Sequence, residues 1–380
     1  MVGGGPGAFI GGVHRMAAAL DGRFELVAGA FSSDATRSRE AGEGLGIAPA
    51  RTYGSFAEMA ESEAALPEDE RIEVVSIVTP NHLHHPAAMA FLKSDMHVIC
   101  DKPLTTTLAD AEELCQETSG RGLVFCVTHN YSGYPMVKEA RERVRAGDLG
   151  PVRKVVVEYS QGWLATLLEA EGHKQASWRA DPDRAGVSSA LGDVGSHAQH
   201  LAHYVTGLAM DELFADLGTL VEGRVLEDDA TVLIRYAGGS RGLLTASQVA
   251  IGERNHLRLR VYGSRAGLDW SQEQPDRLRL VSSDGTETIL HTGGAGLSAR
   301  AMAHQRLPAG HPEGFIPAFA NLYQNVARTL DARAGRADSG AFDGDFPTVQ
   351  DGARGVFFIH AAVRSSAAGT WIPAAYEPPA

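Results

Sequence analysis

The sequence predicts an α/β domain over residues 1–129, built on a doubly wound parallel sheet, and an α+β domain over residues 130–380, built on an open and predominantly antiparallel sheet. In the first third, short Val- and Ile-rich runs alternate with helical segments, as in buried parallel strands joined by helices. After residue 150, apolar and polar residues alternate within strands that glycine-rich turns connect, as in antiparallel hairpins. A chain of 380 residues is long enough to form two cores.

The predicted strands of the first domain are continuous apolar runs, each followed by a helical segment. They cover residues 24–31, 73–80, 96–103 and 123–129. Only Met1 and Val2 precede the glycine turn that follows the first strand, whereas a core strand has about five residues. We therefore expect that the first strand is truncated at residue 1 and that Met1 is not the natural start.

The predicted strands of the second domain lie within residues 152–283. The turns at 237–242 and 263–267 are rich in glycine and predict hairpins. No helix follows these strands to cover one face of the sheet. We therefore expect a homodimer or homotetramer that forms through this open face.

Three helices are predicted in the second domain. The first runs from Asp193 to Thr206, ahead of most of the sheet, and the others cover residues 317–334 and 349–369. We expect the last helix to pack back on the first domain.

Composition excludes several classes of function. The formal net charge of −13, with no basic stripe, excludes nucleic acid as the main partner. No apolar run approaches the roughly 18 residues of a membrane span, and the N-terminus lacks the features of a secretory signal. Cys100, Cys115 and Cys126 lack metal-site spacing and cannot all pair, so we expect reduced thiols in a cytoplasmic protein.

The stretch "VGGGPGAFIGG" lies where the first strand turns into the first helix. Glycines at such a turn let the backbone approach a pyrophosphate, and the helix N-terminus supplies amide groups to it. The spacing here is Gly3, Gly5 and then Gly11, because Ala8 occupies the position of the usual third glycine. We expect a dinucleotide cofactor at a turn that is longer than usual.

The end of the second strand carries the residues that distinguish NAD from NADP. An acid for the adenosine ribose is usual there, and this chain has Ser32, Ser33 and Asp34, with Arg37 one turn later. Asp34 can reach a ribose hydroxyl, whereas Arg37 can bind a 2′-phosphate. The sequence leaves NAD and NADP both open, with NAD as the first expectation.

Three motifs together indicate the family. They are "TPNHLHH" (79–85), "CDKP" (100–103) and "GDVGSH" (192–197). With these motifs and the glycine turn, nearly the whole chain resembles the Gfo/Idh/MocA family of sugar and cyclitol oxidoreductases. The resemblance implies an N-terminal Rossmann domain that binds NAD or NADP.

The same resemblance implies roles for individual residues. Lys102 matches the family lysine that touches both the nicotinamide side and the substrate hydroxyl, although Asp101 replaces the usual glutamate before it. Asp193 and His197 match the family pair, as a ligand of the substrate hydroxyl and the general base.

The residues themselves are consistent with hydride transfer. Oxidation of a carbinol requires a proton to leave its oxygen, and histidine is the natural base near neutral pH. Asp193 precedes His197 by one helical turn, so we expect both side chains on one face. Lys102 lies at the carboxyl end of its strand, where ligands bind in such sheets, and it can stabilise the developing alkoxide.

Two further groups of histidines have alternative interpretations. The stretch "NHLHH" (81–85) could hold a metal, but we expect Pro80, Asn81 and His84 in a strand-end loop over the nicotinamide, with His85 on the surface. Asp193, His197 and His200 have a spacing that a metal could use, but no fourth ligand is apparent, so we predict no metal.

Further side chains are candidates for substrate contact. They are Tyr131, Trp163, Lys174, Trp178, Arg179, His200 and His311. An indole beside a guanidinium suits a sugar face or an anionic group, and Lys174 with Arg179 makes an acidic sugar an option. In the alternative interpretation, Trp178 is a packing anchor and Arg179 forms an ion pair within the protein.

Three functions remain open from the sequence. The first is a dehydrogenase that oxidises a ring hydroxyl of a sugar, glycoside or cyclitol, with C3 as the expected position. The second is a redox-neutral NAD-dependent glycoside hydrolase, acting by oxidation, elimination, water addition and reduction, with an anionic sugar such as a sulfoquinovoside as one possible substrate. The third is a non-catalytic cofactor sensor, which has no need of the Lys102, Asp193 and His197 set.

Overall fold

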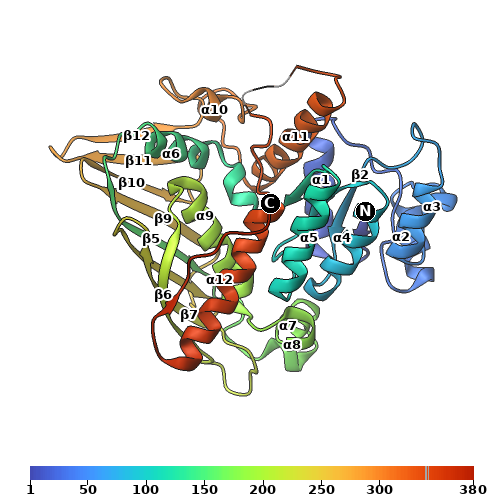
Figure 1. Ribbon diagram of the computed structural model, residues 1–380, viewed down its shortest axis with the longest axis horizontal. Helices are drawn as coiled ribbons and strands as arrows, with labels where there is room; N and C mark the ends of the chain where they lie inside the picture. The colour runs from blue at the N-terminus through green and yellow to red at the C-terminus, as the bar shows by residue number, and fades with distance from the viewer. Residues whose placement is uncertain (339, 341) are drawn as a thin grey trace. The chain divides into compact units, whose positions relative to one another are not determined.

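The computed structural model describes residues 1–338, 340 and 342–380, and shows two compact units (Figure 1). Unit 1 comprises residues 1–128, 319–353 and 378–380, and unit 2 comprises residues 129–318 and 354–377. Among the described residues, no helix has the length and apolar character needed to cross a membrane.

Unit 1 contains a four-stranded sheet in the order β1-β2-β3-β4, with every neighbouring pair parallel. Its strands are β1 (Val2–Gly3), β2 (Val74–Val78), β3 (His97–Cys100) and β4 (Phe125–Val127). These bounds fall within the apolar runs, and the fold class predicted for the first domain is confirmed. The strands are buried because helices follow each of them along the chain.

The helices of unit 1 follow the predicted alternation. They are α1 (Phe9–Leu20), α2 (Ala35–Gly44), α3 (Phe56–Ala64), α4 (His84–Lys93) and α5 (Leu108–Gly120), with short 3-10 turns at Pro49–Arg51 and Asn81–Leu83. The side chains of Asp34, Ser55 and Thr107 cap α2, α3 and α5. Most of α11 (Phe315–Arg333) and the start of α12 (Val349–Ala368) also belong to this unit.

The segment 24–31, predicted as a strand, differs in the structure. It contains no strand, only isolated parallel bridges from Gly29 to Thr52 and from Ala30 to Val2. The Phe31 ring occupies the space beside Gly29, only 2.2 Å from where a Cβ on this glycine would lie. Backbone hydrogen bonds still join this segment to both neighbours, because the Gly3 amide donates to the Ala30 carbonyl at 2.9 Å and the Gly29 amide donates to the Arg51 carbonyl at 3.0 Å.

Unit 2 contains a nine-stranded sheet in the order β12-β11-β10-β9-β5-β8-β7-β6-β13. All neighbouring pairs are antiparallel except β5 and β8. The strands are β5 (Val152–Ser160), β6 (Met210–Gly218), β7 (Asp229–Tyr236), β8 (Arg241–Ser247), β9 (His256–Gly263), β10 (Ala266–Ser271), β11 (Arg277–Ser282), β12 (Glu287–His291) and β13 (Ile372–Pro373). The β7–β8 and β9–β10 hairpins form at the glycine-rich turns that predicted them, so the antiparallel prediction is confirmed.

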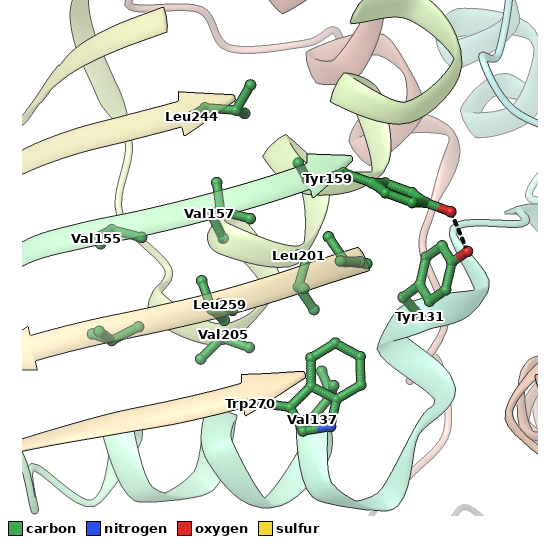
Figure 2. Packing of buried hydrophobic residues seen from close by; sticks show 14 of the residues in the cluster. Tyr131, Val137, Val155, Val157, Tyr159, Leu201, Val205, Leu244, Leu259 and Trp270 are labelled. Carbon is green, nitrogen blue, oxygen red and sulfur yellow. Dashed lines mark hydrogen bonds between the residues drawn. The ribbon is translucent and has the colours of Figure 1, made fainter. Parts of the chain in front are cut away.

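The helices of unit 2 include α6 (Pro135–Arg145), α7 (Lys174–Arg179), α8 (Pro182–Ala185), α9 (Ser196–Thr206) and α10 (Ala299–Met302), with the 3-10 turns Asn130–Gly133 and Leu168–Glu171 and the π-helical turn Leu191–Gly195. Helices α6 and α9 pack against the strands of this sheet. Figure 2 shows Leu201 and Val205 of α9 and Val137 of α6 against Val157 and Leu259 of the strands. This core fixes the start of α9, which carries the candidate catalytic residues.

The opposite face of the sheet carries charged pairs between neighbouring strands. Arg258 and Asp269 form a bidentate pair with a shortest distance of 2.6 Å. Arg260, also on β9, lies 3.1 Å from Glu158 of the neighbouring strand β5. Side chains alternate between the two faces of a strand, so these charges lie opposite the buried Leu257 and Leu259.

Candidate functional site

The glycine turn of unit 1 is a closely packed loop that only glycines can form. A Cβ on Gly11 would lie 2.3 Å from the Gly4 Cα, and a Cβ on Gly5 would lie 2.6 Å from the Phe31 carbonyl oxygen. Gly11 therefore performs the close packing of helix against turn that the third glycine performs in the usual spacing. No described side chain caps the first turn of α1 at Ala8, so this helix N-terminus fits a pyrophosphate.

Arg15 supports the turn from α1, a role that sequence reasoning missed. Its Nη1 donates to the Gly4 carbonyl at 2.9 Å, and burial lowers the pKa of its guanidinium. A single sequence carries no signal for this contact, because the partner is a backbone atom.

Asp34 ends the segment that leads from the turn to α2. Its Oδ1 accepts a hydrogen bond from the Arg37 amide at 2.9 Å, so the carboxylate caps the helix. The Asp34 amide in turn donates to Ser32 Oγ at 3.1 Å. Ser33 and the Arg37 side chain are exposed beside it, which places all four predicted residues in one short segment.

The loops after β2 and β3 are tied together by His84. Its Nδ1 lies 2.8 Å from the Pro103 carbonyl oxygen and its Nε2 lies 3.0 Å from the Thr79 carbonyl oxygen. Burial lowers the pKa of this fully buried ring, and the charge of Asp101 opposes the effect. His84 therefore holds the turn that follows Lys102 against the turn that begins at Pro80.

Lys102 follows β3 in a turn fixed by its neighbour. The Lys102 amide donates to Asp101 Oδ1 at 2.9 Å, and Thr128 Oγ1 donates to the same oxygen at 2.9 Å. Pro80 precedes the 3-10 turn that contains Asn81, which is buried. The glycine turn, the Pro80 turn and Lys102 thus follow the carboxyl ends of β1, β2 and β3, where parallel sheets bind ligands, whereas residues 32–37 follow the segment 24–31.

In unit 2, Asp193 lies in the π-helical turn and not in the α-helix that the sequence predicted. The α-helix begins at Ser196, after the π-helical turn Leu191–Gly195. A Cβ on Gly195 would lie 2.6 Å from Leu191 Cδ1, so a larger residue there would displace the Leu191 side chain. Such π-helical insertions are frequent at functional sites.

The Asp193 carboxylate is held by two donors. Its Oδ2 accepts from Arg179 Nε at 3.0 Å and from Gln248 Nε2 at 2.9 Å. Arg179 is flat against Trp178, with its guanidinium carbon 4.2 Å from the ring centroid, and its Nη1 donates to Gln175 Oε1 at 2.8 Å. The ion pair that the sequence left as an alternative for Arg179 is therefore present.

Three buried imidazoles lie together beyond Asp193. His197 is edge-on to His129, with ring centroids 5.4 Å apart, and His129 is stacked on His200 at 4.4 Å with an interplanar angle of 7°. Sequence reasoning missed His129, although its place directly after a buried strand was a usable signal. The three histidines form one cluster of rings rather than a row of exposed side chains on the helix.

Tyr131 packs against His197 and begins a chain of hydrogen bonds. Its ring is edge-on to His197 at 4.8 Å, and its hydroxyl lies 2.5 Å from the Tyr159 hydroxyl (Figure 2). The Tyr159 hydroxyl donates to Asn255 Oδ1 at 2.6 Å. Burial raises the pKa of Tyr131, so its hydroxyl keeps its proton at neutral pH.

The remaining predicted substrate contacts are dispersed. Trp163 is half-buried and donates from Nε1 to Gln161 Oε1 at 2.9 Å. His311 is exposed on the loop before α11, where its Nδ1 lies 3.1 Å from the Pro308 carbonyl oxygen. Lys174 is the first residue of α7, but its side chain lies outside the described residues.

The described residues contain two sets of three side chains with metal-ligand spacing. They are His85, Asp110 and Glu113 in unit 1, and Glu253, His256 and Glu273 in unit 2. Neither set includes Asp193, His197 or His200. The metal interpretation of that motif thus finds no such cluster in the described part of the chain.

Two family models match the sequence. The model for the oxidoreductase family with an NAD-binding Rossmann fold matches residues 1–129. The model for the GFO/IDH/MocA C-terminal domain matches residues 137–269. Together they cover the glycine turn, the Lys102 turn and the Asp193–His197 segment.

Individual proteins are similar over the full length. An oxidoreductase of Bacillus subtilis, YfiI, is 34% identical, covering 98% of this chain and 95% of its own. The levoglucosan dehydrogenase of Pseudarthrobacter phenanthrenivorans is 27% identical, covering 96% of each chain. An inositol dehydrogenase homologue of Azotobacter vinelandii, solved with NAD+, is 36% identical with a TM-score of 0.93, covering 98% of this chain and 96% of its own.

A second structure of the Azotobacter protein contains NADH and myo-inositol, with a TM-score of 0.90. The two family models together match more than half of the chain, and YfiI is 34% identical over 98% of it. The chain therefore belongs to the Gfo/Idh/MocA oxidoreductase family and is an NAD(P)-dependent oxidoreductase of the sugar and inositol dehydrogenase type.

Proposed function

We propose that this protein is an NAD-dependent dehydrogenase that oxidises a ring hydroxyl of an uncharged cyclitol or sugar. The observation that carries the proposal is the Asp193 carboxylate, held by Arg179 and Gln248 at the start of the helix that carries His197. A fixed carboxylate accepts a hydrogen bond from a substrate hydroxyl, and a nearby imidazole removes the proton.

Each candidate residue has a separate chemical role in this proposal. NAD bound at the glycine turn of unit 1 supplies the hydride acceptor. In unit 2, His197 takes the hydroxyl proton and Asp193 orients the carbinol. The charge-stabilising role of Lys102, in unit 1, is taken from the family resemblance alone. Tyr131 and His129 pack against the His197 ring and fix its orientation.

The ion pair of Arg179 supports an uncharged substrate. Its Nε is bonded to Asp193 and its Nη1 to Gln175, so the guanidinium charge is balanced within unit 2. A sulfonate or uronate group would compete with Asp193 for the same cation. The myo-inositol of the Azotobacter structure and the substrate named for levoglucosan dehydrogenase are both uncharged polyols, in line with this choice.

The position of Asp34 supports NAD over NADP. Its carboxylate is fixed at the N-terminus of α2 by the Arg37 amide. A negative charge held at the end of the second β-segment repels a 2′-phosphate and can accept a bond from a ribose hydroxyl. The Azotobacter relative was solved with NAD+ and with NADH.

We also propose that the open face of the unit 2 sheet forms a homodimer interface. On this face the strands carry the charged pairs described above. They also carry two apolar side chains, Leu233 and Tyr262, that are partly exposed. Sedimentation at micromolar concentration tests this, because a monomer would contradict the proposal.

The first experiment separates the chemical alternatives. The purified protein is incubated with NAD+ and a panel containing myo-inositol, neutral hexoses, and neutral and anionic nitrophenyl glycosides, while absorbance at 340 nm and released nitrophenol are followed together. A dehydrogenase accumulates NADH without nitrophenol, and product analysis identifies the carbon, which we expect to be C3 in a hexose. Nitrophenol release that requires NAD+, without net NADH, identifies a redox-neutral glycosidase and overturns the proposal.

A further inference from the structure

The start of the helix that carries Asp193 and His197 is fastened to a distant loop in unit 2. Glu227, which lies two residues before β7, is buried, and its carboxylate faces the segment 188–191. Glu227 Oε1 accepts from the Ser189 amide at 3.0 Å, the Leu191 amide at 3.0 Å and Ser188 Oγ at 2.6 Å. The backbone carbonyl of Glu227 also accepts from the Ala190 amide at 3.2 Å.

These bonds determine how the π-helical turn begins. Ser188 Oγ donates to Glu227 and accepts from the Gly192 amide at 2.9 Å. The next amide, that of Asp193, donates to the Ser189 carbonyl at 2.8 Å. The Glu227 carboxylate thus satisfies amides at the beginning of the turn, as a capping side chain does, although it lies far away in the sequence.

Asp228, the residue after Glu227, is connected to Asp193 through Gln248. The Asp228 carbonyl accepts from the Gln248 amide nitrogen at 2.9 Å, and the Gln248 side chain donates from Nε2 to Asp193 Oδ2 at 2.9 Å. Gln248 is fully buried, and its Oε1 has no hydrogen-bond partner in the described part of the chain. Burying Gln248 Oε1 without a hydrogen-bond partner costs folding free energy. The hydrogen bond from Gln248 Nε2 to Asp193 is the interaction that accounts for a glutamine at this position.

Asp228 is itself held rigidly. Its carboxylate accepts from the Leu220 amide at 2.8 Å and the Val221 amide at 3.0 Å, and it forms a buried ion pair with Arg224 at 3.1 Å. Arg224 also binds Glu169 at 2.8 Å. The loop that carries Glu227 and Asp228 is therefore a fixed support and not a mobile connection.

We propose that Glu227 and Gln248 are positioning residues for Asp193, with Glu227 fixing the backbone of the π-helical turn and Gln248 fixing the carboxylate. The inference rests on the proposed function, in which Asp193 binds the substrate hydroxyl. Neither residue touches the substrate. Both act through Asp193, and the support of a catalytic group commonly changes activity by about 10- to 100-fold.

The principal test compares two buried glutamates of unit 2. Glu227→Gln removes the charge that binds the segment 188–191. Glu139→Gln is the matched control, because Glu139 is also fully buried and accepts from the Ser298 amide at 2.7 Å and Arg143 Nε at 2.6 Å, away from Asp193. Hydrogen–deuterium exchange of the full-length proteins measures peptides covering residues 188–195, and steady-state kinetics with NAD+ and myo-inositol measure kcat and KM.

We expect Glu227→Gln to raise exchange in 188–195 by about tenfold, the change that follows from losing one strong hydrogen bond. We expect kcat to fall by about 10- to 100-fold while the KM for NAD+ is unchanged. Glu139→Gln leaves exchange in 188–195 and kcat as in the wild type. Unchanged exchange in the Glu227 variant overturns the positioning role, and raised exchange with unchanged kcat overturns its importance for the reaction.

A second variant tests the hydrogen bond from the Gln248 side chain to Asp193, and it remains useful if Glu227→Gln folds poorly. Gln248→Met keeps the side-chain volume but removes the donor to Asp193, so kcat/KM for the polyol falls by about tenfold without a change in exchange at 188–195. A kcat/KM equal to the wild type contradicts the role of Gln248. If the wild-type protein reduces NAD+ with no polyol, the proposed function fails, whereas the exchange measurement still decides whether Glu227 holds the turn.

Discussion

The two units build their parts of the site in different ways. In unit 1 the candidate cofactor-binding features are mostly backbone: a glycine turn, a helix N-terminus that no described side chain caps, and strand ends whose peptide groups His84 and Asp101 hold in place. In unit 2 the candidate catalytic groups are side chains, and other side chains hold them, as Arg179 and Gln248 hold Asp193. Backbone features tolerate few residue types, whereas side-chain networks depend on partners far apart in the sequence.

This difference predicts how each unit responds to substitution. A change in unit 1 that adds a Cβ where backbone atoms already fill the space should affect cofactor binding, because the backbone itself must move. A change in unit 2 that removes a polar group should affect the chemical step and leave cofactor binding intact. The following predictions test this division.

The largest effect is expected at His197. Replacing it in His197→Asn removes the base and should lower kcat by about 1000-fold, within the range of general-base catalysis, while the Kd for NAD+ stays unchanged. Stopped-flow or steady-state absorbance at 340 nm measures kcat, and intrinsic fluorescence quenching measures NAD+ binding.

The control for this prediction lies on the same helix. His203 is half-buried, and its Nδ1 lies 3.1 Å from the Leu208 carbonyl oxygen. His203→Asn should therefore keep kcat near the wild-type value. An equal loss in both variants would show that helix damage, and not the missing base, causes the effect.

The glycine turn offers the next largest effect, with its control one residue away. A Cβ on Gly11 would lie 2.3 Å from the Gly4 Cα, whereas the nearest atom to a Cβ on Gly12 lies 4.0 Å away. Gly11→Ala should weaken NAD+ binding by about 100-fold through overpacking of the turn. Gly12→Ala should bind NAD+ as the wild type does, and isothermal titration measures both. Equal affinities would contradict the role assigned to Gly11.

A stability effect is expected from His14, which is fully buried in unit 1. Its Nδ1 lies 2.7 Å from the Tyr323 hydroxyl and 3.1 Å from Ser76 Oγ, and burial lowers the pKa of His14 from 6.5 to about 4. Between these values the unfolded chain binds a proton that the folded chain does not. The contribution of neutral His14 to the free energy of unfolding is therefore fully present above the unfolded pKa, and it is lost as the pH falls from 6.5 towards 4.

The size of this effect follows from the two pKa values. Between about pH 7.5 and about pH 5, His14 should contribute roughly 2 kcal/mol to the loss of unfolding free energy. Urea unfolding of the wild type and His14→Gln at both pH values measures the difference in pH dependence. A variant whose stability changes with pH as steeply as the wild type would contradict the assignment.

Much of unit 1 and of the sheet in unit 2 could be predicted, because the signals are local. The apolar runs at 73–80, 96–103 and 123–129 each contain a strand, and both glycine-rich turns of the second domain form hairpins. The segment 24–31, predicted as a strand, forms only isolated bridges to Val2 and Thr52, because its partner β1 has two residues and the composition of the run does not reveal this.

The support of the candidate site could not be predicted, because its contacts join distant positions. Gln248 is 55 residues from Asp193, and Glu227 is 36 residues from Leu191. Nothing in the neighbours of either residue distinguishes it from an ordinary polar side chain near a strand end. The motif "GDVGSH" indicated the helix, but the π-helical turn within it depends on bonds to Glu227 that only the folded chain forms.

The smallest effect concerns the preference for NAD over NADP. It tests whether the Asp34 side chain in unit 1 contributes to this preference. Asp34→Asn keeps a residue that caps helices equally well, so the fold of α2 is preserved while the charge is lost. The ratio of kcat/KM for NAD+ to that for NADP+ should fall by about threefold, the size expected for an exposed charge. Asp181→Asn makes the same change at the N-terminus of α8 in unit 2 and should leave the ratio unchanged. If the ratio is also unchanged in Asp34→Asn, the carboxylate does not face the adenosine ribose, and the backbone alone would determine cofactor binding in unit 1.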